Sequence, residues 1–264
     1  MNELLVFICD GAPVRGEIVS ISTAWQAVLE RRNDPSAVRR ILGDFVGAAT
    51  LLSASLKFDG TLIIQAQSKG PIQLLVVECK SDLSMRATVK LSVDPSQIAT
   101  DASLGELLDA CNSGRLVITL DPSEREPGQA PYQGIVALQQ QYGNHFKPVS
   151  SAAEAIGLYM QNSEQLDTRI WLASNDTHIG GLLLQRLPNS GGHVNLDAQT
   201  AAEGWTRIQT LGETITNEEL LTLPPNTILR RLFLEESTEN GVRSFPSRQI
   251  RFSCRCSRNK VADV

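Results

Sequence analysis

The sequence predicts an α+β fold in which antiparallel strands surround one buried helix. Residues 36–57 have a helical pattern, and no charged residue occurs between Phe45 and Leu56. A helix that is apolar all round offers no face to water, so it should lie inside the fold. Three strand-like segments follow it, and their connections are too short for a crossover helix, which indicates an antiparallel meander.

The residues before the central helix predict a hairpin and a short helix. Apolar runs separated by a Gly-Ala-Pro turn are typical of paired strands. Asp34 and Pro35 suit the N-cap and the first position of the central helix. The elements expected here are strands at 4–9 and 14–20 and a helix from Ser22 or Thr23 to Arg31.

The residues after the central helix alternate between strand-like and short helical patterns. The middle strand of the meander is apolar on both faces and should lie inside its sheet. Ser151 and Glu154 have the spacing of a capping box. The elements expected are strands at 61–67, 72–79 and 85–93, a helix at 103–110, strands at 116–120 and 132–138, a helix at 151–161, and a hairpin of 169–173 with 180–187.

Composition changes after Pro188. Residues 189–192, Asn-Ser-Gly-Gly, form a flexible joint, and residues 198–235 carry helical patterns. Thr216 and Glu219 form a second capping box. Apolar content in this region is modest, so we expect it to dock weakly on the main domain. A polar stretch at 235–241 follows it.

The last alternating segment, residues 249–256, predicts a strand with two cysteines on one face. In an extended strand, side chains two apart point the same way, which groups Ile250, Phe252, Cys254 and Cys256. Two sulfurs so placed could hold one soft metal ion, and the surrounding arginines would favour the thiolate form. A closed structural zinc site needs four ligands, and this segment supplies two. The alternative is that both cysteines are small buried apolar residues.

Charge and motifs exclude several classes of function. The 264 residues carry a net charge of −5, which argues against nucleic-acid binding. Five irregularly spaced cysteines, no signal-peptide pattern and no long apolar run predict a cytoplasmic protein without a membrane partner. Neither a catalytic signature nor a phosphate-binding glycine loop is present in the sequence.

A series of short stretches resembles the 33-kDa heat-shock protein family, the redox-regulated holdase chaperones. They lie in the family's order, cover nearly the whole chain and are specific only together. The stretches are Arg15-Gly-Glu-Ile-Val19, Leu56-Lys-Phe-Asp-Gly60, Leu74-Leu-Val-Val-Glu-Cys79, Tyr132-Gln-Gly-Ile-Val136, Ser163-Glu-Gln-Leu166, Leu183-Leu-Gln-Arg-Leu-Pro188, Glu218-Glu-Leu-Leu221 and Phe252-Ser-Cys-Arg-Cys-Ser257.

The resemblance implies two sheets enclosing the buried helix, followed by a helical linker and a small zinc domain. The corresponding division is a chaperone domain at 1–188, a linker at 189–235 and the start of the zinc domain at 236–264. Family members bind zinc through Cys-x-Cys, matched here by Cys254 and Cys256, and through a later Cys-x-x-Cys that this chain lacks. We therefore expect either a truncated form or a differing gene product. Residues 139–149 look like an insertion without an assigned role.

The resemblance also implies a function that needs no ATP and no enzymatic step. Oxidation of the thiols releases zinc and unfolds the small domain, and the linker then exposes apolar surface for unfolding client proteins. With only half a zinc site, the segment from Phe245 onward should be mobile, or ordered only by a second copy in a homodimer. Two alternatives stay open: an enzyme with an unrecognised site in the two-sheet domain, and a zinc-ribbon nucleic-acid binder.

Overall fold

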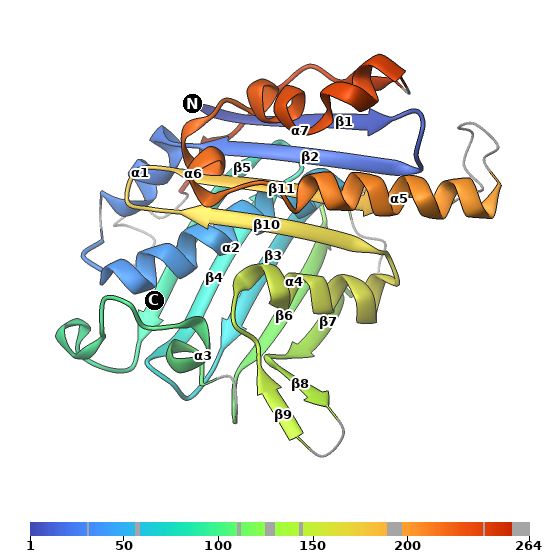
Figure 1. The fold of residues 1–264 in the computed structure, drawn as a ribbon. Coiled ribbons are helices and arrows are strands. Elements are labelled where there is room, and N and C mark those ends of the chain that lie inside the picture. Colours follow the sequence, from blue (N-terminus) through green and yellow to red (C-terminus); the bar gives the residue numbers. More distant parts are fainter. Residues whose placement is uncertain are drawn as a thin grey trace.

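The structure is a computed structural model that describes residues 1–30, 32–55, 59–109, 112–124, 130–142, 145–188, 197–239 and 241–254. These residues form an α+β fold with two main sheets and a central helix, α2 (Ser36–Ser55), that contacts both (Figure 1). The predicted fold class is confirmed. The predicted helix included residues 56 and 57, which lie outside the described residues.

The first sheet, sheet A, is antiparallel and brings together the two ends of the chain. Its central strand, β2, pairs along its full length with β1 on one side and β11 on the other. The strand order is β10-β11-β2-β1-β12, and β13 also pairs with β1. Its strands are β1 (Asn2–Cys9), β2 (Val14–Ile21), β10 (Thr168–Ser174), β11 (Ile179–Arg186), β12 (Val242–Ser244) and β13 (Arg248–Gln249).

The second sheet, sheet B, contains the predicted meander. Its order is β14-β5-β4-β3-β6-β7. The segment that looked like an insertion is a separate hairpin of β8 (Gln139–Tyr142) and β9 (His145–Pro148). The strands of sheet B are β3 (Gly60–Gln67), β4 (Ile72–Lys80), β5 (Ser84–Leu91), β6 (Arg115–Pro122), β7 (Tyr132–Ala137) and β14 (Arg251–Phe252).

Three shorter helices contribute apolar side chains to the core around α2. Ser103 and Glu106 form a reciprocal capping box at α3, whereas at α4 Ser151 caps Glu154 N–H and the Glu154 carboxylate turns to Ser150. The Ser22 hydroxyl does not cap α1 but donates to the carbonyl of Met1. The helices are α1 (Thr23–Leu29), α3 (Leu104–Leu107) and α4 (Ala152–Tyr159), with a 3-10 turn at Pro95–Gln97 and a π-turn at Met160–Glu164.

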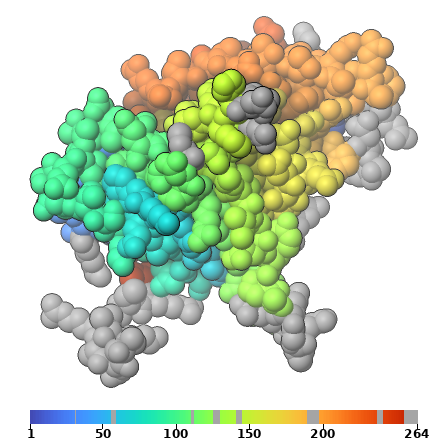
Figure 2. Space-filling view, turned by 90° about the horizontal axis from the view of Figure 1, so that it is seen from below, coloured from blue at the N-terminus to red at the C-terminus, as the bar shows by residue number. Residues whose placement is uncertain are grey.

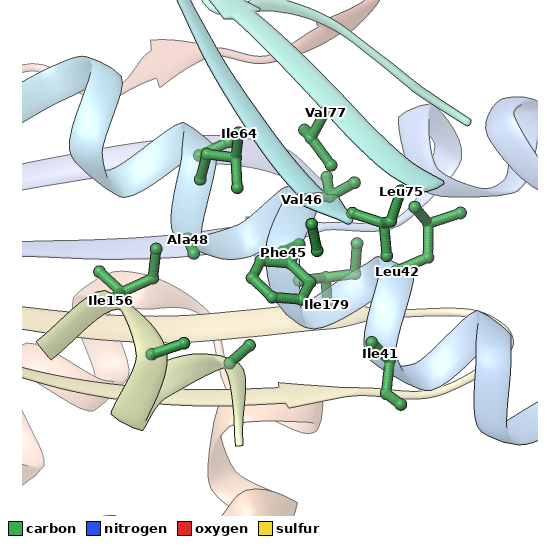
Figure 3. Close-up of a cluster of buried hydrophobic side chains, with 14 of the residues drawn as sticks. Ile41, Leu42, Phe45, Val46, Ala48, Ile64, Leu75, Val77, Ile156 and Ile179 are labelled. Carbon is green, nitrogen blue, oxygen red and sulfur yellow. The ribbon is translucent and has the colours of Figure 1, made fainter. Parts of the chain in front are cut away.

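Helix α2 is buried because side chains from both sheets pack around it. Figure 3 shows Phe45 between strands of sheet B on one side and the side chains of Ile156 and Ile179 on the other. Close approach depends on small residues: a Cβ at Gly43 would lie 2.7 Å from Ser174 Cβ, and one at Gly47 would lie 3.0 Å from Ile179. The surrounding core side chains include Leu42, Val46, Ile64, Leu75 and Val77.

The predicted single strand at 249–256 is wrong over residues 249–254, and residues 255 and 256 lie outside the described residues. The chain bends at Ile250, which is 2% exposed, so β13 joins sheet A and β14 joins sheet B. Cys254 is exposed and does not share the buried position of Ile250. The described part of this segment pairs with the chain's own two sheets, because each sheet offers an open strand edge that satisfies its backbone groups.

Glu17 is a fully buried carboxyl on the face of β2 that points toward α2. Its Oε1 lies 2.7 Å from Arg15 Nε, and the Arg15 guanidinium also donates to the carbonyls of Ala54 and Ser55 at the end of α2. Burial raises the pKa of Glu17 from 4.5 to about 7, against the opposing effect of Arg15. This pair therefore makes the joint between α2 and sheet A sensitive to pH.

Ala49→Glu should destabilise the protein severely. Ala49 is completely buried on α2, so the new carboxylate would be an unpaired charge in the core. We expect the free energy of unfolding to fall by about 4 kcal/mol or more, measured by urea denaturation. Ala99→Glu, at an exposed position, is the matched control. Equal stability of the two variants would contradict the enclosure of α2.

Glu17→Gln should remove a pH dependence of stability. Because the folded state of the parent binds the proton of Glu17 more tightly, the contribution of this residue to the free energy of unfolding should be fully present below pH 4.5. It should then fall by roughly 3 kcal/mol as the pH rises through about 7. The glutamine variant should show a flatter curve over this interval, whereas exposed Glu218→Gln should keep the parent's slope. A parent curve that rises between these pH values would refute the assignment.

Candidate functional site

A layer of three helices covers the face of sheet A that points away from α2. The helices are α5 (Ala198–Gly212), α6 (Asn217–Thr222) and α7 (Pro225–Glu239), which we call the helical layer. In Figure 2 the orange helices α5 and α6 form a band along one side of the molecule, apart from the cyan and green strands of sheet B. The helical layer therefore packs on sheet A and not on sheet B.

The helical layer and sheet A share a second hydrophobic core. Trp205 and Ile208 of α5 point inward, and Phe233 of α7 packs against Phe7 of β1 with ring centroids 5.3 Å apart. The modest apolar content of the layer is concentrated on the inner faces of its helices, so the layer docks through a hydrophobic core. The expectation that this docking is weak stays a prediction. The core consists of Leu5, Phe7, Cys9, Ala12, Val14, Ile18, Ala173, Leu182, Leu184, Trp205, Ile208, Leu220, Ile228, Leu229, Leu232 and Phe233.

Three glycines allow the helical layer to come very close to sheet A and to the turn between β1 and β2, because no side chain separates the two surfaces at these positions. A Cβ at Gly180 on β11 would lie 2.0 Å from the carbonyl oxygen of Leu220 on α6. On α5, a Cβ at Gly204 would lie 2.9 Å from Ala12 Cβ, and one at Gly212 would lie 2.8 Å from Leu184. Since real Cβ atoms essentially never come that close, larger residues at these positions would push the layer away from its support.

Two ion pairs hold the layer together. The guanidinium of Arg207 on α5 binds both carboxylate oxygens of Glu236 on α7, at 2.5 and 3.1 Å, and Glu236 is 3% exposed. Arg231 lies 2.6 Å from Glu219, the residue that completes the predicted capping box with Thr216. Sequence reasoning missed the Glu236 pair, because a run of glutamates in a polar stretch is most simply a solvated face.

Cys9 lies on β1 beneath this layer and is protected as a thiol. Burial, followed by the negative charges of Glu236 and Asp10, raises its pKa to about 12. Burial likewise raises the pKa of Cys79 on β4 to about 12. Because the thiolate is the reactive and metal-binding form, neither cysteine is a candidate ligand or nucleophile in this arrangement.

The candidate metal ligands lie at the end of the described chain. Cys254 is exposed, two residues beyond β14, and Cys256 lies outside the described residues. The donor chemistry suits zinc, but two thiolates form only half of a closed site. In the described part of the chain, no three His, Cys, Asp or Glu side chains are grouped to hold a metal ion.

Three cavities of similar size lie at the surface of the described part of the chain. Two of about 410 and 430 Å³ flank α4, and their linings include Gln140 and Gln161; the third, of about 400 Å³, lies beside α3. The buried carboxyls Glu17 and Asp44, whose pKa values burial raises to about 7 and about 6, line none of the three cavities.

Among the described helices, none has the length and apolar character needed to cross a membrane.

The chain is similar to known proteins over its whole length. The family model described as Hsp33 protein matches residues 2–264. The 33 kDa chaperonin of Chromobacterium violaceum is 42% identical over 263 residues, which cover 100% of this chain and 80% of that protein. The 33 kDa chaperonin of Neisseria meningitidis serogroup B is 41% identical over 258 residues, 98% of this chain and 76% of that protein.

The chain belongs to the Hsp33 family. The crystal structure of the 33 kDa chaperonin from Thermotoga maritima has the same fold, with a TM-score of 0.70 over 100% of this chain and 84% of that one. Its sequence identity is 18%, so this comparison concerns the fold alone. Membership places the chain in a family of non-enzymatic chaperones and confirms the resemblance read from the sequence.

Gly180→Ala should loosen the helical layer of this Hsp33 family member. The methyl group would collide with the backbone of α6. We expect limited proteolysis between residues 188 and 224 to become about tenfold faster, the change that corresponds to a loss of about 1.4 kcal/mol in local stability. Gly157→Ala on α4 is the matched control, since no atom lies within 4 Å of its added Cβ. Identical cleavage rates for both variants would contradict this account.

Proposed function

We propose that the chain is an ATP-independent, redox-regulated holdase that binds unfolding proteins under oxidative stress. Membership of the Hsp33 family over the full chain is the observation that carries this proposal. Relatives named 33 kDa chaperonin, about 40% identical, support it. We further propose the division into a chaperone domain at 1–188, a linker at 189–235 and the start of a redox-switch domain at 236–264, in a cytoplasmic protein.

The helical layer supports this function because it covers an apolar surface. Phe7, Ile18 and Leu182 face α5–α7 and not water. Departure of the layer would expose these side chains together with the inner faces of its own helices. A contiguous apolar surface of this kind is what a partially unfolded protein can bind without a defined sequence. The layer thus acts as a cover over the proposed client surface.

Regulation is proposed to begin at Cys254 and Cys256. These two residues would hold zinc as half of a four-thiolate site, and bound zinc would supply folding energy to the segment around them. Cys254 is exposed and so accessible to oxidants, whereas Cys9 and Cys79 are buried thiols with raised pKa values. The chain therefore confines its redox sensitivity, among the cysteines described, to its C-terminal end.

The chain should suppress aggregation of a thermally unfolding client without ATP. Because residues 1–264 supply two of the four thiolates, we expect a preparation of these residues to suppress aggregation in the reduced as well as the oxidised state. The measurement is light scattering of the client over a range of chaperone ratios, with serum albumin at equal mass as the control. Scattering that is the same with and without the chain, in both redox states, would refute the holdase function.

The half-site is tested on the same preparation by metal analysis and a thiol count. After reduction and washing with a chelator, we expect less than one zinc per chain and ready alkylation of Cys254 and Cys256. One tightly held zinc per chain with both thiols protected would show instead that further ligands, such as those of a second copy, complete the site.

A further inference from the structure

Residues 242–253, which we call the C-terminal strap, bridge the outer edges of both sheets. The strands β12 and β13 pair with β1 in sheet A, and β14 pairs in parallel with the start of β5 in sheet B. The strap begins just after α7 and ends next to Cys254. Two strand edges are therefore occupied by an extended segment of the same chain.

The strap is held mainly through its backbone. Phe245 N–H donates to Val6 O at 2.9 Å and Ile250 N–H to Asn2 O at 3.0 Å. On sheet B, Arg251 N–H donates to Leu83 O at 3.1 Å and Ser253 N–H to Met85 O at 3.0 Å. The side chains of residues 243–249 are exposed, and two of them add to the backbone bonds: Arg243 forms an ion pair with Asp10, and Arg248 donates to the carbonyl of Ser81. A strand edge that binds a partner mainly through backbone hydrogen bonds can accept extended segments of almost any sequence.

One apolar side chain anchors the strap between the sheets. Ile250 is 2% exposed and belongs to the core that surrounds α2. It sits where β13 ends and β14 begins, so the pocket it fills lies between the two edges. A segment with one bulky apolar residue among exposed neighbours therefore matches this surface, a pattern that unfolding proteins supply abundantly.

The strap is also built to be displaced. Its strands contain three, two and two residues, and Pro246, which has no N–H to donate, separates the first two. The turn that receives β14 is strained, because Leu83 is a buried leucine with φ of +62°. Backbone strain of this kind persists only while surrounding contacts enforce it. Loss of the Arg251–Leu83 hydrogen bond would remove one of those contacts.

We propose that the edges of β1 and β5 are a client-binding surface that takes extended apolar segments by strand addition, and that the C-terminal strap is its internal competitor. This inference rests on the proposed holdase function and adds a second surface, distinct from the face under the helical layer. Since Cys254 directly follows Ser253, a change at the cysteines would act on the last strand of the strap first.

The test uses the full chain with two variants that weaken the strap. Ile250→Asp places a charge in the anchoring pocket, and Arg251→Pro removes the N–H that binds Leu83 O. Ile135→Asp, at a 61% exposed position on β7, is the control for the same chemical change. Circular dichroism shows whether each variant is folded. If one strap variant does not fold, the other is sufficient for the test.

The probe is a fluorescent peptide with the sequence of residues 242–253, and its binding is measured by anisotropy. We expect each strap variant to bind the peptide about tenfold more tightly than the parent and the control do. This factor corresponds to a strap that occupies the edges about 90% of the time in the parent, which leaves about a tenth of the molecules free to bind the peptide. A peptide with proline at positions 251 and 253 lacks two of the donors and should bind at least tenfold more weakly. Equal affinity of the parent and both variants would overturn the proposal.

A competition experiment separates this inference from the holdase function itself. Saturating peptide should reduce the ability of Ile250→Asp to suppress client aggregation, and should not do so when the proline peptide is used. Full suppression in the presence of saturating peptide would refute the edge surface while leaving the holdase function intact. Variants that dimerise in sedimentation and no longer bind peptide would show that a second copy is the occupant, which also overturns the proposal.

Discussion

The whole structure depends on the enclosure of helix α2, which carries no charge from Phe45 to its end, between two sheets. The first turns of α2 carry Arg40, which is exposed, but from Phe45 onward no charged side chain is present, so the burial of this part requires apolar partners in several directions at once. Sheet B supplies them on one side, while β11 and α4 supply them on the other. Small residues such as Gly43 and Gly47 then decide how closely the strands approach. Both sheets are therefore fixed relative to one helix.

Sheet A differs from sheet B because both of its faces are buried. Along β2, Val19 and Ile21 point toward α2, and Val14 and Ile18 point toward the helical layer. The period-2 alternation of a strand makes these two faces independent in composition. One face belongs to the core around α2, and the other carries the helical layer, the proposed cover of the client surface. This division fits the proposed holdase, in which apolar surface must be available without unfolding the domain.

The C-terminal strap connects the helical layer with the outer edges of both sheets. It continues directly from α7 and ends at the proposed redox residues, and on the way it pairs with an edge of each sheet. Movement of the strap and movement of the helical layer are thus connected through the chain itself. Exposed strand edges are otherwise a hazard for a protein, so occupation by short strands of the same chain also protects them.

The sequence by itself determined the buried helix, most strand positions, the capping box at Thr216 and the family. These depend on local periodicity and on residues close in sequence, and they appear in the structure with only small shifts of boundary. Candidate ligands Cys254 and Cys256 were also visible as a motif, although their grouping on one face was inferred from a strand that the structure divides.

Only the tertiary structure decided the docking of the helical layer, the burial of Glu17 and Glu236, and the split of the C-terminal strand between sheets. Each depends on residues far apart in the chain: Gly180 meets Leu220, and Ile250 meets the edge of β1. An alternating segment looks the same whether it joins one sheet or two. Which strand edges are open, and which glycines face a neighbouring backbone, is set by packing and not by local pattern.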